Sequence, residues 1–262
     1  MTQAAYYDIF NGDADGICAL HQLRLAEPRE ATLVTGVKRD IRLLDQVAQV
    51  RGAELTVLDI SLDSNRTPLL HLLESCRVFY VDHHYAGDLP HSPNLIAHLD
   101  PSPEVCTSLM VDTLLGGRFR GWAVAAAFGD NLHGSARKSA ATLDLAESQL
   151  ERLRELGELM NYNGYGREVA DLHVVPQALY AAVKPYGDPL AFCEEAEILA
   201  LLRQGFADDL RRARAVAPLR ETSKGRIFAF PAEKWASRIA GVFSNEKARE
   251  RVETAHALLV DN

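Results

Sequence analysis

The sequence predicts an α/β protein whose first part is a doubly wound, mainly parallel sheet. Within the first hundred residues, apolar runs of strand length alternate repeatedly with segments of helical periodicity. Strands that are separated by helices of this length usually pair in parallel. In addition, acidic and imidazole side chains follow directly after three of the apolar runs. The carboxyl ends of parallel strands share one edge of a sheet, where such folds bind their ligands.

Each element is expected from its own pattern of apolar residues. The first part predicts strands at 5–10, 31–36, 54–61, 77–84 and 94–100, with helices at 16–27, 41–50 and 67–76. From about residue 104 to 219, apolar residues recur every three or four positions, which predicts helices at 104–116, 121–132, 141–164 and 194–217. After a polar joint, one β-α-β unit is expected, with a strand at 226–233, a helix at 234–252 and a strand at 255–262.

Composition limits the classes of partner. The 262 residues carry a net charge of -8, which argues against non-specific binding of duplex nucleic acid but leaves a small phosphate-bearing ligand open. No apolar stretch is long enough for a membrane span, and the first residues lack the pattern of a signal peptide. The four cysteines are scattered without metal-binding spacing. We therefore expect a cytoplasmic protein with free thiols and no membrane partner.

Polar side chains at the ends of the first, third and fourth predicted strands are candidates for a functional site. They are Asn11, Asp13 and Asp15, then Asp59, and finally Asp82, His83 and His84. Any one aspartate here has a simpler explanation as a helix N-cap. Several acids at one edge, however, repel one another unless some are protonated or cations bind between them. Oxygen ligands with an occasional imidazole suit Mg²⁺ or Mn²⁺.

Four short motifs resemble those of the DHH phosphoesterase superfamily. They are "NGDADGI" at 11–17, "VLDIS" at 57–61, "VDHH" at 81–84 and "FGDNL" at 128–132. Each motif alone is weakly specific, but the ordered set, which spans roughly the first 130 residues, is strongly specific. The superfamily includes single-strand-specific exonucleases, oligoribonucleases, cyclic-dinucleotide phosphodiesterases and family II inorganic pyrophosphatases.

The resemblance implies a site for two divalent cations, usually Mn²⁺, with Mg²⁺ as the alternative. Carried over by position, the ligands are Asp13 for the first cation, Asp15, His83 and Asp130 for the second, and Asp59 between the two. Two such cations activate a bridging water and stabilise both oxygens of an in-line displacement at phosphorus.

The same resemblance implies catalytic roles for four residues, Asp59, Asp82, His83 and His84. His84 would contact the substrate phosphate. Asp82 would either orient a neighbouring group or coordinate a cation directly.

Two positions depart from the family pattern. Many relatives have a histidine four residues before the first motif aspartate, where this sequence has Ile9. The exonuclease-like branch has an aspartate two residues before it, where this sequence has Asn11. The amide oxygen of Asn11 can ligate a cation but brings no negative charge. A weaker, exchangeable first cation is therefore expected.

The motifs and patterns together predict three parts. Residues 1–135 form the DHH-type metal-binding domain, residues 136–222 a helical connector, and residues 223–262 a short α/β segment. The last part resembles the beginning of the substrate-binding domain of nucleotide hydrolases in this family. It has no triple-glycine stretch, so we expect that domain to be partial or reduced.

Basic and aromatic residues outside the motifs are candidates for substrate binding. Arg137 and Lys138 closely follow Asp130, as part of either a solvated basic loop or a phosphate clamp. Tyr165 and Arg167 follow a predicted helix in a glycine-rich stretch, which is either a simple helix stop or a loop that stacks on bases and pairs with phosphate.

The expected helix start at "PSPEVCTSL" also has two interpretations. Ser102, Thr107 or Ser108 could cap the helix, or the backbone amides there could bind phosphate.

These observations predict a metal-dependent phosphoesterase that acts on short single-stranded oligonucleotides or small nucleotides. Two alternatives remain open. One is hydrolysis of inorganic pyrophosphate or polyphosphate, and the other is a nucleotide-binding regulatory protein without turnover. The sequence also leaves open whether the chain forms a homodimer.

Overall fold

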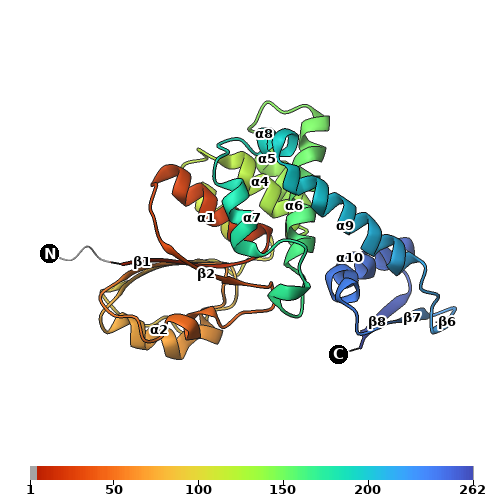
Figure 1. Ribbon diagram of the computed structural model, residues 1–262, viewed down its shortest axis with the longest axis horizontal. Helices are drawn as coiled ribbons and strands as arrows, with labels where there is room; N and C mark the ends of the chain where they lie inside the picture. Colours follow the sequence, from red (N-terminus) through yellow and green to blue (C-terminus); the bar gives the residue numbers. More distant parts are fainter. Residues whose placement is uncertain (1–4, 262) are drawn as a thin grey trace.

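The computed structural model describes residues 5–261, and its first hundred residues form a five-stranded parallel sheet (Figure 1). The strands are β1 (Tyr6–Asn11), β2 (Thr32–Gly36), β3 (Glu54–Leu58), β4 (Arg77–Asp82) and β5 (Leu95–Leu99). Their spatial order is β2-β1-β3-β4-β5, with every neighbouring pair parallel. The predicted doubly wound parallel sheet is confirmed, and its topological switch point lies between β1 and β3.

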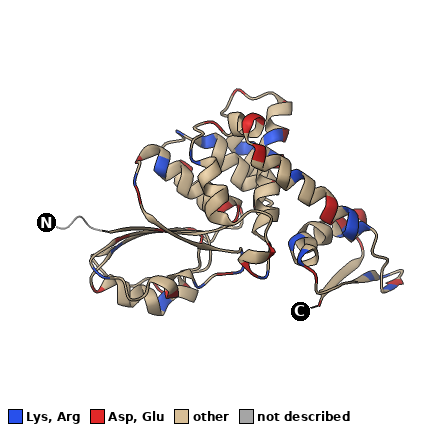
Figure 2. Ribbon diagram, viewed as in Figure 1, with Lys and Arg blue, Asp and Glu red and all other residues tan. Residues whose placement is uncertain are grey.

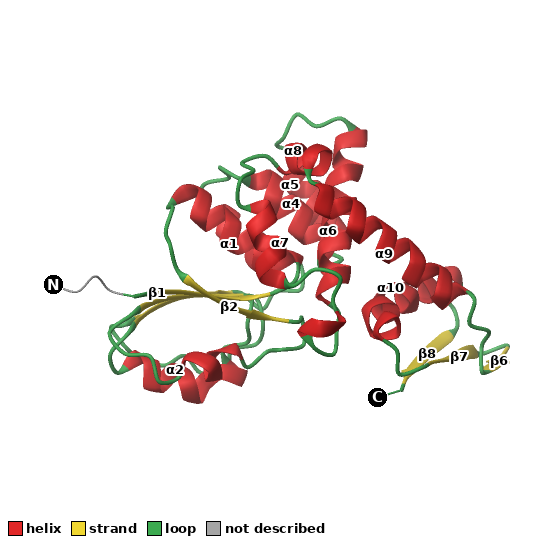
Figure 3. Cartoon of the chain, viewed as in Figure 1, coloured by secondary structure: helices red, strands yellow, loops and turns green. Residues whose placement is uncertain are grey.

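Helices cover both faces of this sheet (Figures 1 and 3). Successive side chains of a strand point to opposite faces, so Ile9 and Phe10 of β1 enter different hydrophobic clusters. Phe10 packs with α1 (Ala14–Ala26) and the helices of the middle region. Ile9 packs in a cluster with residues of α2 (Arg66–Leu73) and of the short 3-10 helix η1 (Leu43–Val47), and the 3-10 helix η2 (Asp63–Asn65) lies beside both.

The prediction of a helix at 41–50 is wrong, because only the 3-10 turn η1 forms there. The buried side chain of Asn65 accepts a hydrogen bond from the backbone N–H of Leu44 at 3.1 Å and donates to the carbonyl of Ile41 at 2.6 Å. These tertiary bonds replace bonds that an α-helix would have made.

The middle region is helical, as predicted, but the predicted helices are shorter than expected and three further helices form. Its elements are α3 (Thr107–Leu114), α4 (Arg120–Gly129), α5 (His133–Ala140), α6 (Glu147–Gly164), η3 (Val169–Asp171), α7 (Pro176–Val183), α8 (Pro189–Glu195) and α9 (Glu197–Arg214). The basic stretch at 133–140 is the helix α5 rather than a loop, since Ala136 and Ala140 bury one face of it. Helix α6 begins at Glu147 rather than 141, where the Gln149 side chain accepts a bond from the Ala146 N–H.

The predicted C-terminal β-α-β unit is present. It consists of β7 (Gly225–Phe230), α10 (Lys234–Glu250) and β8 (Ala255–Val260), with β7 and β8 parallel. The short exposed strand β6 (Arg220–Thr222), which the polar sequence did not indicate, pairs antiparallel with β7. Helix α9, along which acidic and basic residues alternate, connects this unit to the rest of the chain (Figure 2).

Two further properties follow from the described residues. All four cysteines are buried with free thiols. Among residues 5–261, no helix is both long and apolar enough to cross a membrane.

His21 of α1 makes the fold sensitive to acid. Its ring is 1% exposed, lies edge-on to Trp122 and donates to the carbonyl of Tyr186 at 2.7 Å. Burial lowers the pKa of His21 to about 4, against 6.5 in an exposed histidine. Between these values the unfolded chain binds the proton and the folded chain does not. The free energy of unfolding should therefore fall as the pH drops from 6.5 to 4, by about 3 kcal/mol at most.

The variant His21→Gln, which keeps a donor for Tyr186, should lose most of this pH dependence in urea unfolding. His71→Gln is the matched control, because His71 is exposed on α2. Equal slopes with pH in His21→Gln and the unmodified protein would contradict the prediction.

Candidate functional site

The turn from β1 into α1 holds the first two acids in a buried position. Asp13 is the N-cap of α1, and its Oδ1 accepts hydrogen bonds from the backbone N–H groups of Asp15 and Gly16 at 3.0 and 3.1 Å. The turn passes so close to β2 that a Cβ on Gly12 would lie 2.1 Å from the carbonyl oxygen of Gly36. Glycine is required there for this packing. Asp13 therefore caps α1 and also belongs to the candidate site.

Asp15 lies two residues further along, in the first turn of α1, and faces the N-terminus of α3. Its Oδ2 and Oδ1 accept hydrogen bonds from the backbone N–H groups of Thr107 and Ser108, both at 2.7 Å. The N-cap residue of α3 is Cys106, which makes no side-chain cap bond. The amides at this helix start thus bind an internal carboxylate, an outcome that differs from both sequence interpretations of this segment.

Asp59 follows β3, and its backbone φ is 58°. This value lies in the left-handed region, which residues other than glycine and asparagine rarely adopt. This conformation brings its Oδ1 to 3.4 Å from Nε2 of His83. The same imidazole nitrogen lies 3.6 Å from Oδ2 of Asp130 and 3.9 Å from Oδ2 of Asp15. Neighbouring ligands of an octahedral cation are about 3 Å apart. These atoms fall into two overlapping groups that could each hold a cation, Asp15, His83 and Asp130 in one and Asp59, His83 and His84 in the other.

Electrostatics at this cluster favour a bound cation. Burial, together with the charges of Asp15, Asp13 and Asp130, raises the pKa of Asp59 well above its ordinary value. Burial and the charge of Asp130 likewise raise the pKa of Asp15. A divalent cation would remove this repulsion. The ligand types in these two groups, carboxylates together with imidazole, fit Mn²⁺ or Mg²⁺.

The ring of His84 forms its hydrogen bond with a residue outside the set of atoms around His83. Its Nδ1 donates to Oδ1 of Asp82, the last residue of β4, at 2.7 Å. Asp82 is fully buried, whereas the His84 side chain is 42% exposed. The hydrogen bond with Asp82 raises the pKa of His84. Asp82 therefore orients His84 and favours its cationic form, which suits contact with an anion.

Lys38, which the sequence analysis did not single out, enters the same cluster. It lies two residues after β2, the neighbour of β1. Its Nζ is 2.6 Å from Oδ2 of Asp13 and 2.9 Å from Oδ1 of Asp130, and it donates to Oδ1 of Asn161 at 3.0 Å. Its position at a strand end was the available signal, since the same rule identified the acids after β1, β3 and β4.

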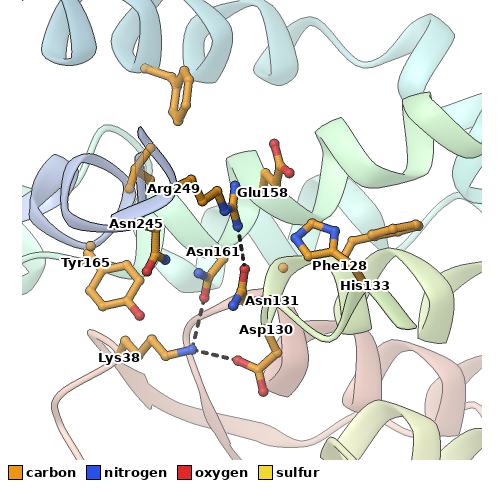
Figure 4. Close-up of a pocket in the computed structure, with 14 residues that line it drawn as sticks. Lys38, Phe128, Asp130, Asn131, His133, Glu158, Asn161, Tyr165, Asn245 and Arg249 are labelled. Carbon is orange, nitrogen blue, oxygen red and sulfur yellow. Dashed lines mark hydrogen bonds and ion pairs between the residues drawn. The ribbon is translucent and has the colours of Figure 1, made fainter. Parts of the chain in front are cut away.

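A cleft extends from this cluster to the C-terminal unit (Figure 4). Lys38, Asp130 and Tyr165 line one side, and α10 contributes Asn245 and Arg249 to the other. Arg249 crosses the cleft and donates to Oδ1 of Asn131 at 3.0 Å. Asn245 and Arg249 were missed by sequence reasoning, because α10 is about one hundred residues away from the motifs in the chain.

The other predicted substrate residues lie in different surroundings. Arg137 of α5 forms exposed ion pairs with Glu147 and Glu151, and Lys138 is exposed beside it. Arg167 pairs with Asp171 at 3.3 Å. None of these three basic residues is among those that line the cleft, whereas Tyr165 is.

Asn11 is buried at the end of β1. It donates to the carbonyl of Lys38 at 3.2 Å, and its Oδ1 has no hydrogen-bond partner among the described residues.

Comparisons with known proteins give matches by structure alone. No family model and no curated protein sequence matches the chain. A manganese-bound exonuclease RecJ superposes with a TM-score of 0.63 at 13% identity, over 98% of this chain and 75% of that one. RecJ from Thermus thermophilus in complex with Mn²⁺ gives 0.63 at 12% identity, but this chain spans only 43% of its length.

The DHH domain of a member of the s1p family of ribosomal proteins gives a TM-score of 0.61 at 12% identity, over 98% of this chain and 72% of that one. At such identities the likeness establishes the fold. The α/β fold expected from the resemblance to the DHH superfamily is therefore confirmed.

Proposed function

From a fold shared with RecJ and a DHH domain, we propose that this chain is a metal-dependent phosphoesterase. Its substrates would be short single-stranded oligonucleotides or small nucleotides, cleaved in the cytoplasm. The observation that carries the proposal is the convergence of carboxylate oxygens from Asp15, Asp59 and Asp130 around Nε2 of His83. A likeness in fold could exist without this arrangement, but metal-dependent phosphoester hydrolysis needs ligands placed in this way.

Each residue has a role that its contacts support. Asp15, Asp59, His83 and Asp130 would hold a divalent cation, which supplies Lewis acidity toward a phosphate oxygen when bound. His84, held by Asp82, would donate a hydrogen bond to the phosphate and stabilise the charge that develops there. Because α3 donates two amides to Asp15, that carboxylate keeps its orientation while substrate binds.

The substrate would enter by the cleft between this cluster and α10. Tyr165 offers an aromatic face for a base, and Arg249 offers a guanidinium for a phosphate. Together they favour a nucleotide over inorganic pyrophosphate, which has no base to stack.

The direct test is release of mononucleotides from short labelled RNA and DNA strands with Mn²⁺ present. Nucleotide monophosphates and pyrophosphate are tested in parallel, each with EDTA as the metal-free control. We expect product from the oligonucleotides that depends on Mn²⁺ and is lost with EDTA. Release of phosphate from pyrophosphate alone would replace the proposed substrate class.

A nucleotide-binding protein without turnover is the second candidate. The ion pairs of Lys38 with Asp13 and Asp130 favour it, because they engage carboxylates that a hydrolase could use for metal. It predicts stabilisation of the fold by a nucleotide with no product in the same assay.

Arg249 gives a specific prediction for substrate capture. The variant Arg249→Met should raise KM for an oligonucleotide roughly tenfold with little change in kcat, because one charge-assisted bond is removed away from the reacting phosphate. Arg251→Met is the matched control, since Arg251 lies two residues on, pairs with Glu221 at 2.8 Å and is not among the residues that line the cleft. Equal KM values for the two variants would refute the role of Arg249.

A further inference from the structure

The ammonium group of Lys38 occupies a place among the carboxylates where a cation could otherwise bind. It contacts Asp13, Asp130 and Asn161 at 2.6, 2.9 and 3.0 Å, and it lies 5.5 Å from the centre of the Tyr165 ring (Figure 4). Its main chain is equally constrained, since its N–H donates to the carbonyl of Gly164 at 2.8 Å. Contacts of both its side chain and its main chain therefore hold Lys38 in the cluster.

Both oxygens of Asp13 have a close neighbour, although the contact of Oδ2 with Lys38 is an ion pair and not a hydrogen bond. Its Oδ1 accepts two amide bonds at the start of α1, and its Oδ2 pairs with Lys38. A divalent cation on Oδ2 would have to share that oxygen with the ammonium at close range, where two positive charges repel strongly. The carboxylate to which the family resemblance assigns the first cation is thus already neutralised.

The other ligand positions of that first cation are also weak. Ile9 stands where many relatives have a histidine, and it is fully buried in the apolar cluster below the sheet. Asn11 adds only a neutral amide oxygen, and its amide nitrogen donates to the carbonyl of Lys38. The residues present therefore do not fit a first divalent cation.

The second position keeps its whole ligand set. Asp130 divides its two oxygens, with Oδ1 toward Lys38 and Oδ2 toward His83 at 3.6 Å. Among the described residues no lysine or arginine forms an ion pair with Asp15 or Asp59, although Nδ1 of His84 lies 4.0 Å from Oδ1 of Asp59. We infer that Lys38 replaces the first of the two cations, so that this chain binds a single divalent cation. The inference builds on the proposed phosphoesterase site and specifies its metal content.

The test is the stoichiometry of Mn²⁺ binding to the metal-free full chain. It is measured by calorimetric titration and by electron paramagnetic resonance, which distinguishes isolated from spin-coupled Mn²⁺. We expect close to one Mn²⁺ per chain with the spectrum of isolated ions. The variant Lys38→Met keeps the length of the side chain and removes its charge. It should bind a second Mn²⁺ and show spin coupling, while Lys38→Arg, the matched control, should keep one.

Two outcomes would overturn the inference. One is two coupled Mn²⁺ ions in the unmodified protein, a result that does not depend on how well any variant folds. The other is a folded Lys38→Met variant, verified by circular dichroism, that still binds only one. Binding of one Mn²⁺ without hydrolysis of any substrate would support the inference and reject the proposed function. Failure of the inference and failure of the proposed function are thus distinguishable.

Discussion

Asp59→Asn is expected to abolish Mn²⁺ binding and to lower the rate of hydrolysis by roughly a thousandfold, while it makes the metal-free protein more stable. The loss follows because Asp59 lies 3.4 Å from His83 in the ligand set and metal polarisation of phosphate contributes several kcal/mol. The gain follows because burial and three neighbouring acids raise the pKa of Asp59 well above its ordinary value. The native fold therefore works against ionisation of this group.

The sign of the pH dependence follows from that shift. A carboxyl with a raised pKa in the folded state destabilises the fold as the pH rises above its ordinary value of 3.8. The stability advantage of Asp59→Asn without metal should therefore grow from about pH 4 upward. Thermal melting with and without Mn²⁺ measures both effects. A variant that melts lower than the unmodified protein without metal, or that Mn²⁺ still stabilises, would contradict the prediction.

Asparagine is the appropriate replacement because of the backbone. The φ of 58° at Asp59 is tolerated by asparagine but strained for alanine. Asp59→Ala should accordingly be about 1 kcal/mol less stable than Asp59→Asn. The comparison separates the loss of the charge from the strain in the main chain.

Arg238→Met should destabilise the packing of the C-terminal unit by about 3–5 kcal/mol, because it leaves a buried carboxylate without its cation. Arg238 of α10 donates to both oxygens of Asp209 on α9, at 2.7 and 3.1 Å, and both residues are less than 10% exposed. Tyr162 of α6 also donates to Asp209. Burial raises the pKa of Asp209, but hydrogen bonds from His173, Arg238 and Tyr162 outweigh it and lower the pKa to about 2.

The matched control joins the same two helices at the surface. Arg214 of α9 pairs with Glu246 of α10 at 2.6 Å, with the arginine side chain 57% exposed. Arg214→Met should cost no more than about 1 kcal/mol, since exposed pairs contribute little. Chemical unfolding of both variants measures the difference, and hydrogen exchange of α10 locates it. Equal losses in the free energy of unfolding for the two variants would contradict the prediction. They would show that the buried pair does not stabilise the C-terminal unit or the position of α10 at the cleft.

Much of the fold could be predicted because its signals are local. Short apolar runs that alternate with helical segments identified every strand of the parallel sheet, and three- and four-residue spacing identified the long helices α6, α9 and α10 to within six residues at either end. The failure at 41–50 came from Asn65, whose side chain takes backbone bonds from a segment more than twenty residues earlier. No local pattern contains such a partner.

The residues of the candidate site could likewise be predicted only in part. Asp13, Asp15, Asp59 and His83 were selected because they follow strands, and parallel strands necessarily end at one edge. Arg137, Lys138 and Arg167 were selected by nearness along the chain to a motif or a helix end, which does not determine where a side chain lies in space. The carboxylate partners of Arg137 and Arg167 belong to α6 and η3.

The parallel sheet, the helical middle region and the edge at which the acids gather could be predicted from local patterns, because they depend on periodicity and on which residues end each strand. The pairing of Lys38 with Asp13, the hydrogen bonds from α3 to Asp15 and the contribution of α10 to the cleft emerge only from the folded chain. They depend on long-range neighbours such as the strand order: β2 lies beside β1, so Lys38, two residues after β2, reaches an acid after β1. Such neighbours depend on the packing of the whole chain and cannot be predicted from a single segment.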